Sequence, residues 1–166
     1  MATVFGSEKF DFLINNAGIG INTPFLSTTE AQFEALYAVQ FKAPFFLTQK
    51  ALDLMNDGGA VINISTGLTR FANPGYSAYA SMKGAMETLT KYQAKELGQR
   101  KIRVNVVAPG AVETDFGGGV VRDVKEVNDH IASLTPLGRV GRLDVRLVFT
   151  NPPCCWVSTK YALSSS

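Results

Sequence analysis

Short apolar runs alternate with longer amphipathic segments along the chain. Phe10–Asn15, Ala60–Ser65 and Arg103–Ala108 have the length and composition of buried strands. Between them, apolar residues recur at helical spacing from Ser27 to about Met55 and from Ser77 to Gly98. Strands that alternate with helices need crossover connections. The pattern therefore predicts an α/β fold with a parallel sheet covered by helices on both faces.

The first helical segment carries boundary signals of its own. Ser27 and Glu30 have the Ser-x-x-Glu spacing of a capping box, which predicts the helix start. Pro44 is expected to break or kink the segment, which then resumes to about Met55. The Asn-Asp-Gly-Gly sequence at residues 56–59 is interpreted as a stop signal.

The remaining segments are a loop, the end of the second helical segment and one further helix. Residues 67–75 contain glycine and proline, which predicts a loop before the second helical segment. Gly98 suits the end of that segment, and a further helix is expected at 121–133.

The composition is that of a folded protein, with 46% of 166 residues hydrophobic and 18% charged. A net charge of +2 indicates neither nucleic acid nor an anionic membrane surface as a partner. No apolar run reaches the roughly 20 residues that cross a bilayer, and Met1–Phe10 does not resemble a signal peptide. The adjacent Cys154 and Cys155 are interpreted as reduced thiols, which predicts a cytoplasmic protein. The single His130 is expected on a helix surface, and no metal site is predicted.

One tyrosine and one lysine carry the candidate chemistry. Tyr79 and Lys83 are four positions apart in the second helical segment, so their side chains share one helix face. A nearby ammonium favours the phenolate and lowers the pKa of a phenol, which then exchanges a proton with an alcohol or carbonyl. The spacing alone is also common in helices without any catalytic role.

Other unusual residues follow the predicted strands, where parallel sheets bind ligands. Ser65 and Thr66 end the second strand, and either hydroxyl could bond a substrate oxygen or simply cap the strand. The Asn15–Gly20 turn contains small residues that let a flat ligand approach the backbone, although a plain strand-to-helix turn also explains it. The Pro109–Thr114 segment follows the third strand and could line a cofactor or form an ordinary tight turn.

Together these motifs closely resemble the short-chain dehydrogenase/reductase family. The ordered set is Asn-Asn-Ala-Gly, Asn-Ile-Ser-Thr, Tyr-x-x-x-Lys and Pro-Gly, and the resemblance covers about Phe10 to Gly141. It implies a partial Rossmann-like, doubly wound fold for residues 1–141, followed by a divergent and poorly ordered tail at 142–166. It also implies hydride transfer between NAD or NADP and a carbonyl or alcohol substrate.

The resemblance assigns roles to particular residues. Tyr79 would be the general acid/base, and Lys83 would lower its pKa and hold the nicotinamide ribose. The family's catalytic serine falls on Thr66, with Ser65 as the alternative. The residues expected to line the cofactor, besides Tyr79 and Lys83, are Asn15, Ala17, Gly18, Pro109, Gly110 and Thr114.

The sequence departs from the family pattern in three places. Gln40 stands where the family's proton relay usually has an asparagine. No Gly-rich turn precedes Asn15, so we expect the family's first strands and the residue that selects NAD or NADP to be missing. The strand at Phe10–Asn15 is then expected to be an exposed apolar edge. After Gly141 the chain no longer resembles the family.

Three functional hypotheses remain open from the sequence. The first is an oxidoreductase that acts on a small carbonyl or alcohol and forms a homo-oligomer. The second is a catalytically inactive remnant that at most associates with full-length relatives, and the third is a binding module that reuses the fold. Four apolar residues of the second helical segment are expected either to pack on a second subunit or to face the sheet: Met82, Ala85, Met86 and Leu89.

Overall fold

A sheet of three parallel strands organises the computed structural model, which describes residues 8–142. The strands follow the chain order β1 (Phe10–Asn15), β2 (Met55–Ile64) and β3 (Arg103–Val107). Five α-helices connect or follow them: α2 (Glu30–Tyr37), α3 (Ala43–Ala51), α4 (Ser77–Glu96), α5 (Val120–Asp123) and α6 (Lys125–Leu134). The prediction of an α/β fold with a parallel sheet is confirmed. The tail expected at 142–166, with both cysteines, lies outside the described residues except for Arg142.

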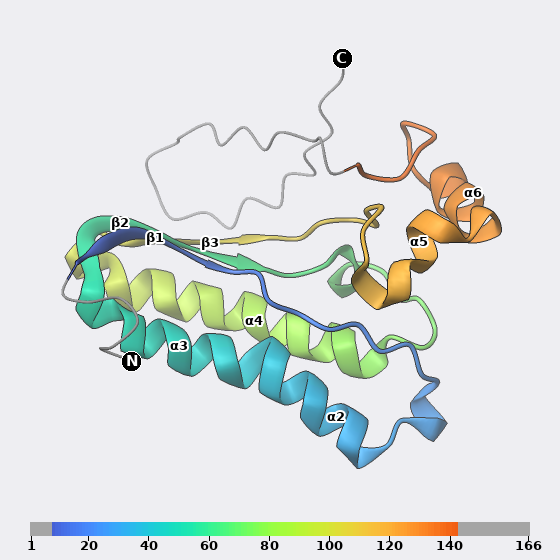
Figure 1. Cartoon of the computed structure of the whole chain (residues 1–166). Coiled ribbons are helices and arrows are strands. Elements are labelled where there is room, and N and C mark those ends of the chain that lie inside the picture. The colour runs from blue at the N-terminus through green and yellow to red at the C-terminus, as the bar shows by residue number, and fades with distance from the viewer. Residues whose placement is uncertain (1–7, 143–166) are drawn as a thin grey trace.

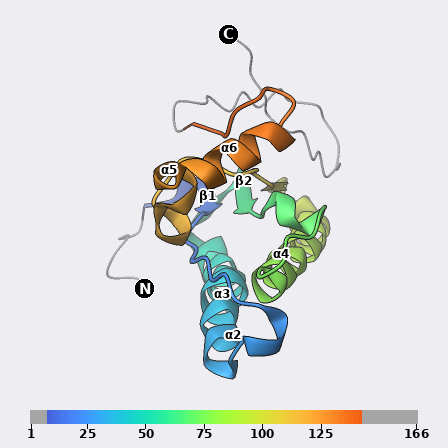
Figure 2. The same cartoon turned by 90° about the vertical axis from the view of Figure 1, so that its right-hand side faces the viewer.

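The helices between the strands lie on one face of the sheet. Figures 1 and 2 show α3 and α4 side by side beneath the strands, whereas α5 and α6 lie beyond the carboxyl end of β3. Both crossovers step in the same direction across the sheet, and right-handed crossovers of that kind place their helices on the same side. Within residues 8–142, the helices that connect the strands thus cover one face of the sheet.

The face opposite α3 and α4 leaves apolar side chains of β1 exposed. Phe12 is 68% exposed and Ile14 is 58% exposed. β1 pairs with β2 alone among the described strands. The expectation that this strand is an exposed apolar edge is thus confirmed for the described residues.

Two buried clusters hold the helices to the sheet. Met55, Val61, Ile102 and Val104 form one cluster beneath the strands. Leu36, Tyr79 and Met82 form the second cluster, near the carboxyl ends of the strands. Because Tyr79 belongs to the second cluster, the candidate chemistry rests on packed side chains.

A buried amide joins the two layers. Asn63 is fully buried, accepts a hydrogen bond from Asn15 Nδ2 at 2.8 Å and donates to Thr90 Oγ1 at 2.9 Å and Gln93 Oε1 at 3.0 Å. Asn15 Nδ2 also donates to Thr48 Oγ1 of α3 at 3.0 Å. One side chain therefore links β1, β2 and α4, and through Asn15 it reaches α3.

The first helical segment differs from the prediction at its start and its end. Thr29, not Ser27, caps α2, because Thr29 and Gln32 form the reciprocal capping pair. A π-helical turn at Ala38–Lys42 replaces the expected break, and Pro44 lies in the first turn of α3, where a missing N–H costs nothing. The segment ends before Met55, which already belongs to β2.

The later boundaries also shift. Residues 56–59, expected to stop the first helix, lie inside β2, and Gly58 adopts a φ of +83° that few other residues tolerate. After α4 the left-handed position falls on Lys101 (φ 56°) instead of Gly98. The single helix expected at 121–133 is divided into α5 and α6 by the extended residue Val124. His130 is exposed on α6, as expected. No helix of the described part could span a membrane.

Candidate active site

Backbone hydrogen bonds bring the segments after β2 and β3 together. Ser65 N donates to Val107 O at 2.7 Å, and Gly67 N donates to Pro109 O at 2.8 Å. The parallel strands therefore deliver two of the predicted motifs to one edge of the sheet. The glycine at position 67 is buried beneath Phe71, whose ring would lie 3.2 Å from an added Cβ.

α4 presents Tyr79 and Lys83 toward this edge. The two residues are only 6% and 5% exposed, respectively. Lys83 Nζ donates to the Ile64 carbonyl oxygen at 2.7 Å and lies 5.8 Å from the centroid of the Tyr79 ring. The prediction that both side chains share one helix face is confirmed, and that face meets the end of β2.

The pKa of Tyr79 runs against the expectation from the sequence. Burial raises the pKa of the phenol above its ordinary value, the hydrogen bond with the Thr66 side chain opposes the rise, and the nearby Tyr76 adds to it. Lys83 was expected to lower this pKa, but in this structure burial outweighs any such effect. The phenol is thus protonated at neutral pH and suited to donate a proton.

The pKa of Lys83 is lowered to about 8 by burial. The ammonium keeps a single acceptor that is described, the Ile64 carbonyl oxygen, in place of the water that would surround an exposed lysine. The side chain is still mostly charged at pH 7. It therefore keeps a positive charge beneath the Tyr79 ring.

This lowered pKa predicts that stability rises with pH. Between about pH 8 and the ordinary lysine value of 10.5, the unfolded chain binds more protons at this position than the folded chain. We expect the free energy of unfolding to rise by about 2 kcal/mol from pH 7 to 9.5 in the wild-type chain, relative to Lys83→Met. Urea unfolding at both pH values measures this difference. An equal change in both proteins would contradict the prediction.

The two candidate hydroxyls have different environments. Thr66 Oγ1 accepts from Leu68 N at 3.3 Å, and its side chain is hydrogen-bonded with the Tyr79 phenol. Ser65 is 3% exposed and donates to Glu87 Oε1 at 2.8 Å. Its hydroxyl is therefore already occupied inside the protein. The geometry favours Thr66 over the alternative Ser65.

Gln40 is buried next to the first predicted turn. It lies in the π-helical turn, is 1% exposed and donates through Nε2 to the Ile19 carbonyl oxygen. Its Oε1 is buried without a described hydrogen-bond partner. An added Cβ on Gly18 would lie 3.2 Å from this amide, so the turn depends on a small residue there. The amide thus supports the turn, and the relay role remains a prediction.

The predicted cofactor residues divide into exposed and internal groups. Ala17 and Gly18 are exposed after β1, and an added Cβ on Gly110 would meet open space. Asn15 points inward, where its amide nitrogen donates to Thr48 and Asn63, so this side chain belongs to the buried network that joins the strands. Its Oδ1 is buried without a described partner. Thr114 Oγ1 accepts from Phe116 N at 3.2 Å, while Pro109 holds Gly67 through its carbonyl group.

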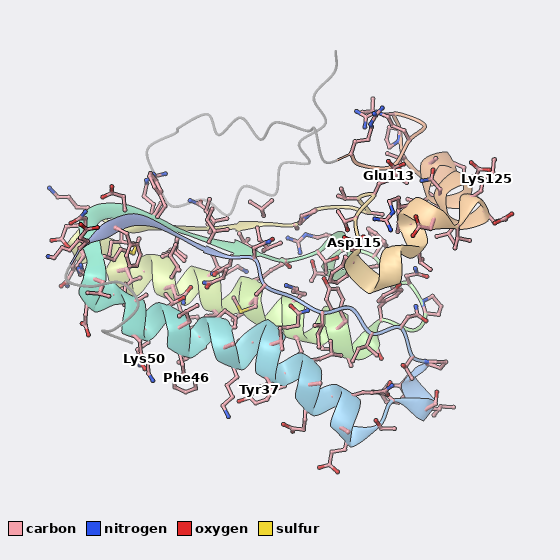
Figure 3. The ribbon with its side chains drawn as sticks, viewed as in Figure 1. Tyr37, Phe46, Lys50, Glu113, Asp115 and Lys125 are labelled. Atoms are coloured by element: carbon pink, nitrogen blue, oxygen red, sulfur yellow. The ribbon has the colours of Figure 1, made fainter. Side chains whose placement is uncertain are left out.

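Sequence reasoning missed two aromatic neighbours of Tyr79. The Phe116 ring centroid lies 5.8 Å from that of Tyr79, and the Tyr76 centroid lies 6.4 Å away. An added Cβ on Gly20 would come within 2.8 Å of Phe116, so this glycine makes room for the ring. Of the two, only Tyr76 could have been expected near Tyr79 from the sequence, because it stands three residues before it. Figure 3 shows Glu113 and Asp115 on the same loop as Phe116, between β3 and α5.

Residues 8–142 contain no group of three histidine, cysteine, aspartate or glutamate side chains placed to hold an ion.

Comparison with known proteins supports the resemblance. A family described as enoyl-(acyl carrier protein) reductase matches residues 2–145. Carbonyl reductase [NADPH] 2 of Sus scrofa is 40% identical over 121 residues, which cover 71% of this chain and 50% of the relative. The 3-oxoacyl-[acyl-carrier-protein] reductase FabG of Thermotoga maritima is 35% identical and covers 81% of this chain and 54% of its own length. The chain thus spans about half the length of the curated relatives it matches.

Solved structures match the fold as well. The angucycline C-6 ketoreductase LanV, with bound NADP, superposes with a TM-score of 0.76 at 38% identity and covers 85% of this chain and 54% of its own. The reductase LugOII gives the same TM-score at 42% identity, covering 85% and 56%. Both identities are high enough to compare the sites as well as the fold.

Proposed function

The chain belongs to the short-chain dehydrogenase/reductase family, and we propose from this premise that it is an NAD(P)-dependent oxidoreductase with Tyr79 as general acid/base. The reaction would transfer hydride between the nicotinamide cofactor and a small carbonyl or alcohol substrate. The observation that carries the proposal is the placement of Tyr79 and the buried Lys83 beside Thr66 at the end of β2, with Lys83 Nζ 2.7 Å from the Ile64 carbonyl oxygen and 5.8 Å from the centroid of the Tyr79 ring. These three groups meet where the strands end, the edge at which parallel sheets bind ligands.

The residues fit a nicotinamide cofactor. Ala17 and Gly18 leave the backbone after β1 exposed, and the space around Gly110 is open. We propose that these residues, with Pro109 and Thr114, line the cofactor, which is NADP or NAD. The names of a relative that uses NADPH and of a solved reductase with bound NADP favour NADP.

Three side chains of this chain would share the chemical work. The Thr66 hydroxyl would donate a hydrogen bond to the carbonyl oxygen of the substrate and keep that oxygen near the Tyr79 phenol. Tyr79 would donate its proton to this oxygen as the alcohol forms. The Lys83 ammonium would stabilise the phenolate left behind. The bound cofactor supplies the hydride.

Binding of the reduced cofactor tests the proposal. The full chain is titrated with NADPH and with NADH while nicotinamide fluorescence is followed, and NADPH oxidation is then recorded with a set of small ketones. We expect saturable binding and ketone-dependent oxidation. A folded sample that binds neither cofactor would favour the inactive remnant, and its association with a full-length relative would then be measured by subunit exchange.

We further propose that the enzyme is a homo-oligomer that uses the outer side of α3 and α4. A groove between these helices is lined by apolar groups that include Phe45, Leu89 and Tyr92. Figure 3 shows Phe46 projecting from α3 away from the sheet, and this residue is 46% exposed. Of the four residues expected to contact a partner, Ala85 and Leu89 line this groove.

For the other two residues, the structure favours the alternative of packing within this chain. Met82 is 8% exposed and Met86 is 2% exposed, so both pack inside this chain and cannot reach a partner. Met82 packs with Leu36 of α2 in the second buried cluster. The cytoplasmic location expected from the sequence remains a prediction.

A charge in the groove is expected to weaken self-association. Tyr92 is 64% exposed, so Tyr92→Glu adds a charge without disturbing the core. We expect sedimentation velocity to show a smaller species than for the wild-type chain at the same concentration. Phe25→Glu is the matched control, since Phe25 is 77% exposed away from the groove. Equal sedimentation of the wild-type chain and Tyr92→Glu would overturn the proposed interface.

A further inference from the structure

Glu87 gathers hydroxyl and guanidinium donors beside the candidate site. The residue lies on α4, one turn beyond Lys83, and its side chain is 12% exposed. Its Oε1 accepts from Ser65 Oγ at 2.8 Å and from Thr69 Oγ1 at 2.7 Å. Its Oε2 accepts from Arg70 Nη1 at 2.6 Å. A single side chain thus binds three residues of one short segment.

The three donors flank Thr66. Ser65 precedes it directly, whereas Thr69 and Arg70 follow it across the 3-10 turn at Gly67–Thr69. Thr69 Oγ1 lies within 2.9 Å of the Thr66 carbonyl oxygen as well. The backbone of Thr66 is therefore held on both sides, by Ser65 before it and by Thr69 and Arg70 after it.

Other contacts tie this segment to a different element. Backbone bonds from Ser65 N and Gly67 N run to the end of β3, not to the helix that carries Tyr79. Besides Glu87, the segment meets α4 through Ser65 Oγ, which lies 3.4 Å from the Lys83 carbonyl oxygen, through Leu68, which packs against the cluster that contains Tyr79 and Met82, and through the contact of Thr66 with Tyr79 itself. Among the described contacts, Glu87 is the α4 side chain that bonds residues on both sides of Thr66.

A carboxylate suits this arrangement better than an amide does. An ionised carboxylate accepts on both oxygens and donates nothing, whereas glutamine accepts on one oxygen only. The amide nitrogen of a glutamine would face the Arg70 guanidinium, which is also a donor. Burial raises the pKa of Glu87, but the bonds from Thr69, Arg70 and Ser65 outweigh it, and the pKa lies below its usual value.

We propose that Glu87 is a positioning residue of the enzyme, which holds the Thr66 hydroxyl in place for the substrate oxygen and for Tyr79. The inference rests on the proposed function and adds to it a group that does not touch the substrate. Tyr79, Lys83 and Glu87 follow one another on α4 at intervals of four residues, about one helical turn. Glu87 therefore lies on the same helix face as Tyr79 and Lys83.

Kinetics of five variants test the inference. In Glu87→Gln we expect kcat to fall about tenfold, because a small displacement of a catalytic group is costly, with the NADPH dissociation constant unchanged. Combined with Thr66→Ala, the change should cause no further loss, because Glu87 acts through Thr66. Glu34→Gln, the same change at an exposed position of α2, should match the wild-type chain. Thr69→Val removes one of the three donors and should give a smaller loss.

Two kinetic results would overturn the inference. One is an unchanged kcat in Glu87→Gln with the wild-type chain active. The other is losses in Glu87→Gln and Thr66→Ala that multiply in the double variant, since that would show an effect that bypasses Thr66. Either result leaves the proposed function standing.

A second measurement separates this inference from the function. The hydrogen bond with Thr66 opposes the rise in the pKa of Tyr79. We therefore expect NMR titration of the labelled Tyr79 phenol to show a higher pKa in Glu87→Gln than in the wild-type chain and in Glu34→Gln. If Glu87→Gln raises the pKa of Tyr79 but the wild-type chain shows no turnover, the proposed function is refuted and the positioning of Thr66 by Glu87 is supported. An unchanged titration would refute the positioning role.

Discussion

Tyr79→Phe is expected to reduce turnover about a thousandfold and to leave NADPH binding within about twofold of the wild-type value. The change removes the one hydroxyl placed to donate a proton beside Thr66, and general acid catalysis contributes about 10²–10⁴-fold to such reactions. The ring itself stays, so its packing against Phe116 and Leu36 is kept. NADPH oxidation with a ketone measures turnover, and nicotinamide fluorescence measures binding.

The matched control is a second tyrosine of the same helix. Tyr92 is 64% exposed at the far end of α4, so Tyr92→Phe removes an equivalent hydroxyl from outside the site. We expect its turnover and melting temperature to equal those of the wild-type chain. Turnover in Tyr79→Phe at the wild-type rate would show that another group supplies the proton, and the assignment of Tyr79 would be wrong.

The pH dependence of the reaction should reflect the same site. Because burial raises the pKa of Tyr79, the phenol stays protonated through neutral pH. Lys83 loses its charge near pH 8 and with it the stabilisation of the phenolate. Under the proposed function, these two directions predict faster carbonyl reduction below pH 8 than above it, and the pH profile of kcat with a ketone measures this difference.

Local patterns were enough to predict the sheet and the helix that carries the site. The continuous apolar runs at Phe10–Asn15 and Arg103–Ala108 became β1 and β3 almost residue for residue. Tyr79 and Lys83 were predicted to share a face because helical periodicity determines it without any tertiary contact. The family resemblance, now confirmed, rested on the same residues.

Contacts between distant segments were invisible to those patterns. Phe116 reaches Tyr79 across 37 positions of sequence, and Glu87 binds Ser65 across 22. The choice between Ser65 and Thr66 likewise depends on which of the two hydroxyls is hydrogen-bonded to Glu87 of α4. The helix start moved to Thr29 because Ser-x-x-Glu and Thr-x-x-Gln are both capping patterns, and sequence alone does not rank them.

Asn63→Ala is expected to lower the free energy of unfolding by about 3 kcal/mol. Asn63 has no exposed surface, and its amide bonds Asn15 of β1 together with Thr90 and Gln93 of α4. Truncation leaves buried donors and acceptors unpaired, each at a cost of about 1–3 kcal/mol, and opens a cavity between sheet and helix. Urea unfolding followed by circular dichroism measures the loss.

Asn105→Ala provides the comparison that separates burial from residue type. Asn105 lies on β3 beside Ile62 of β2 and is exposed, so water replaces whatever its amide binds. We expect its unfolding free energy to stay within about 0.5 kcal/mol of the wild-type value. If both alanine variants lost the same amount, the stability of the layers would come from strand propensity and not from the buried amide. If the loss is confined to Asn63, one polar side chain holds α4 to the sheet and thereby keeps Tyr79 and Lys83 at the strand ends.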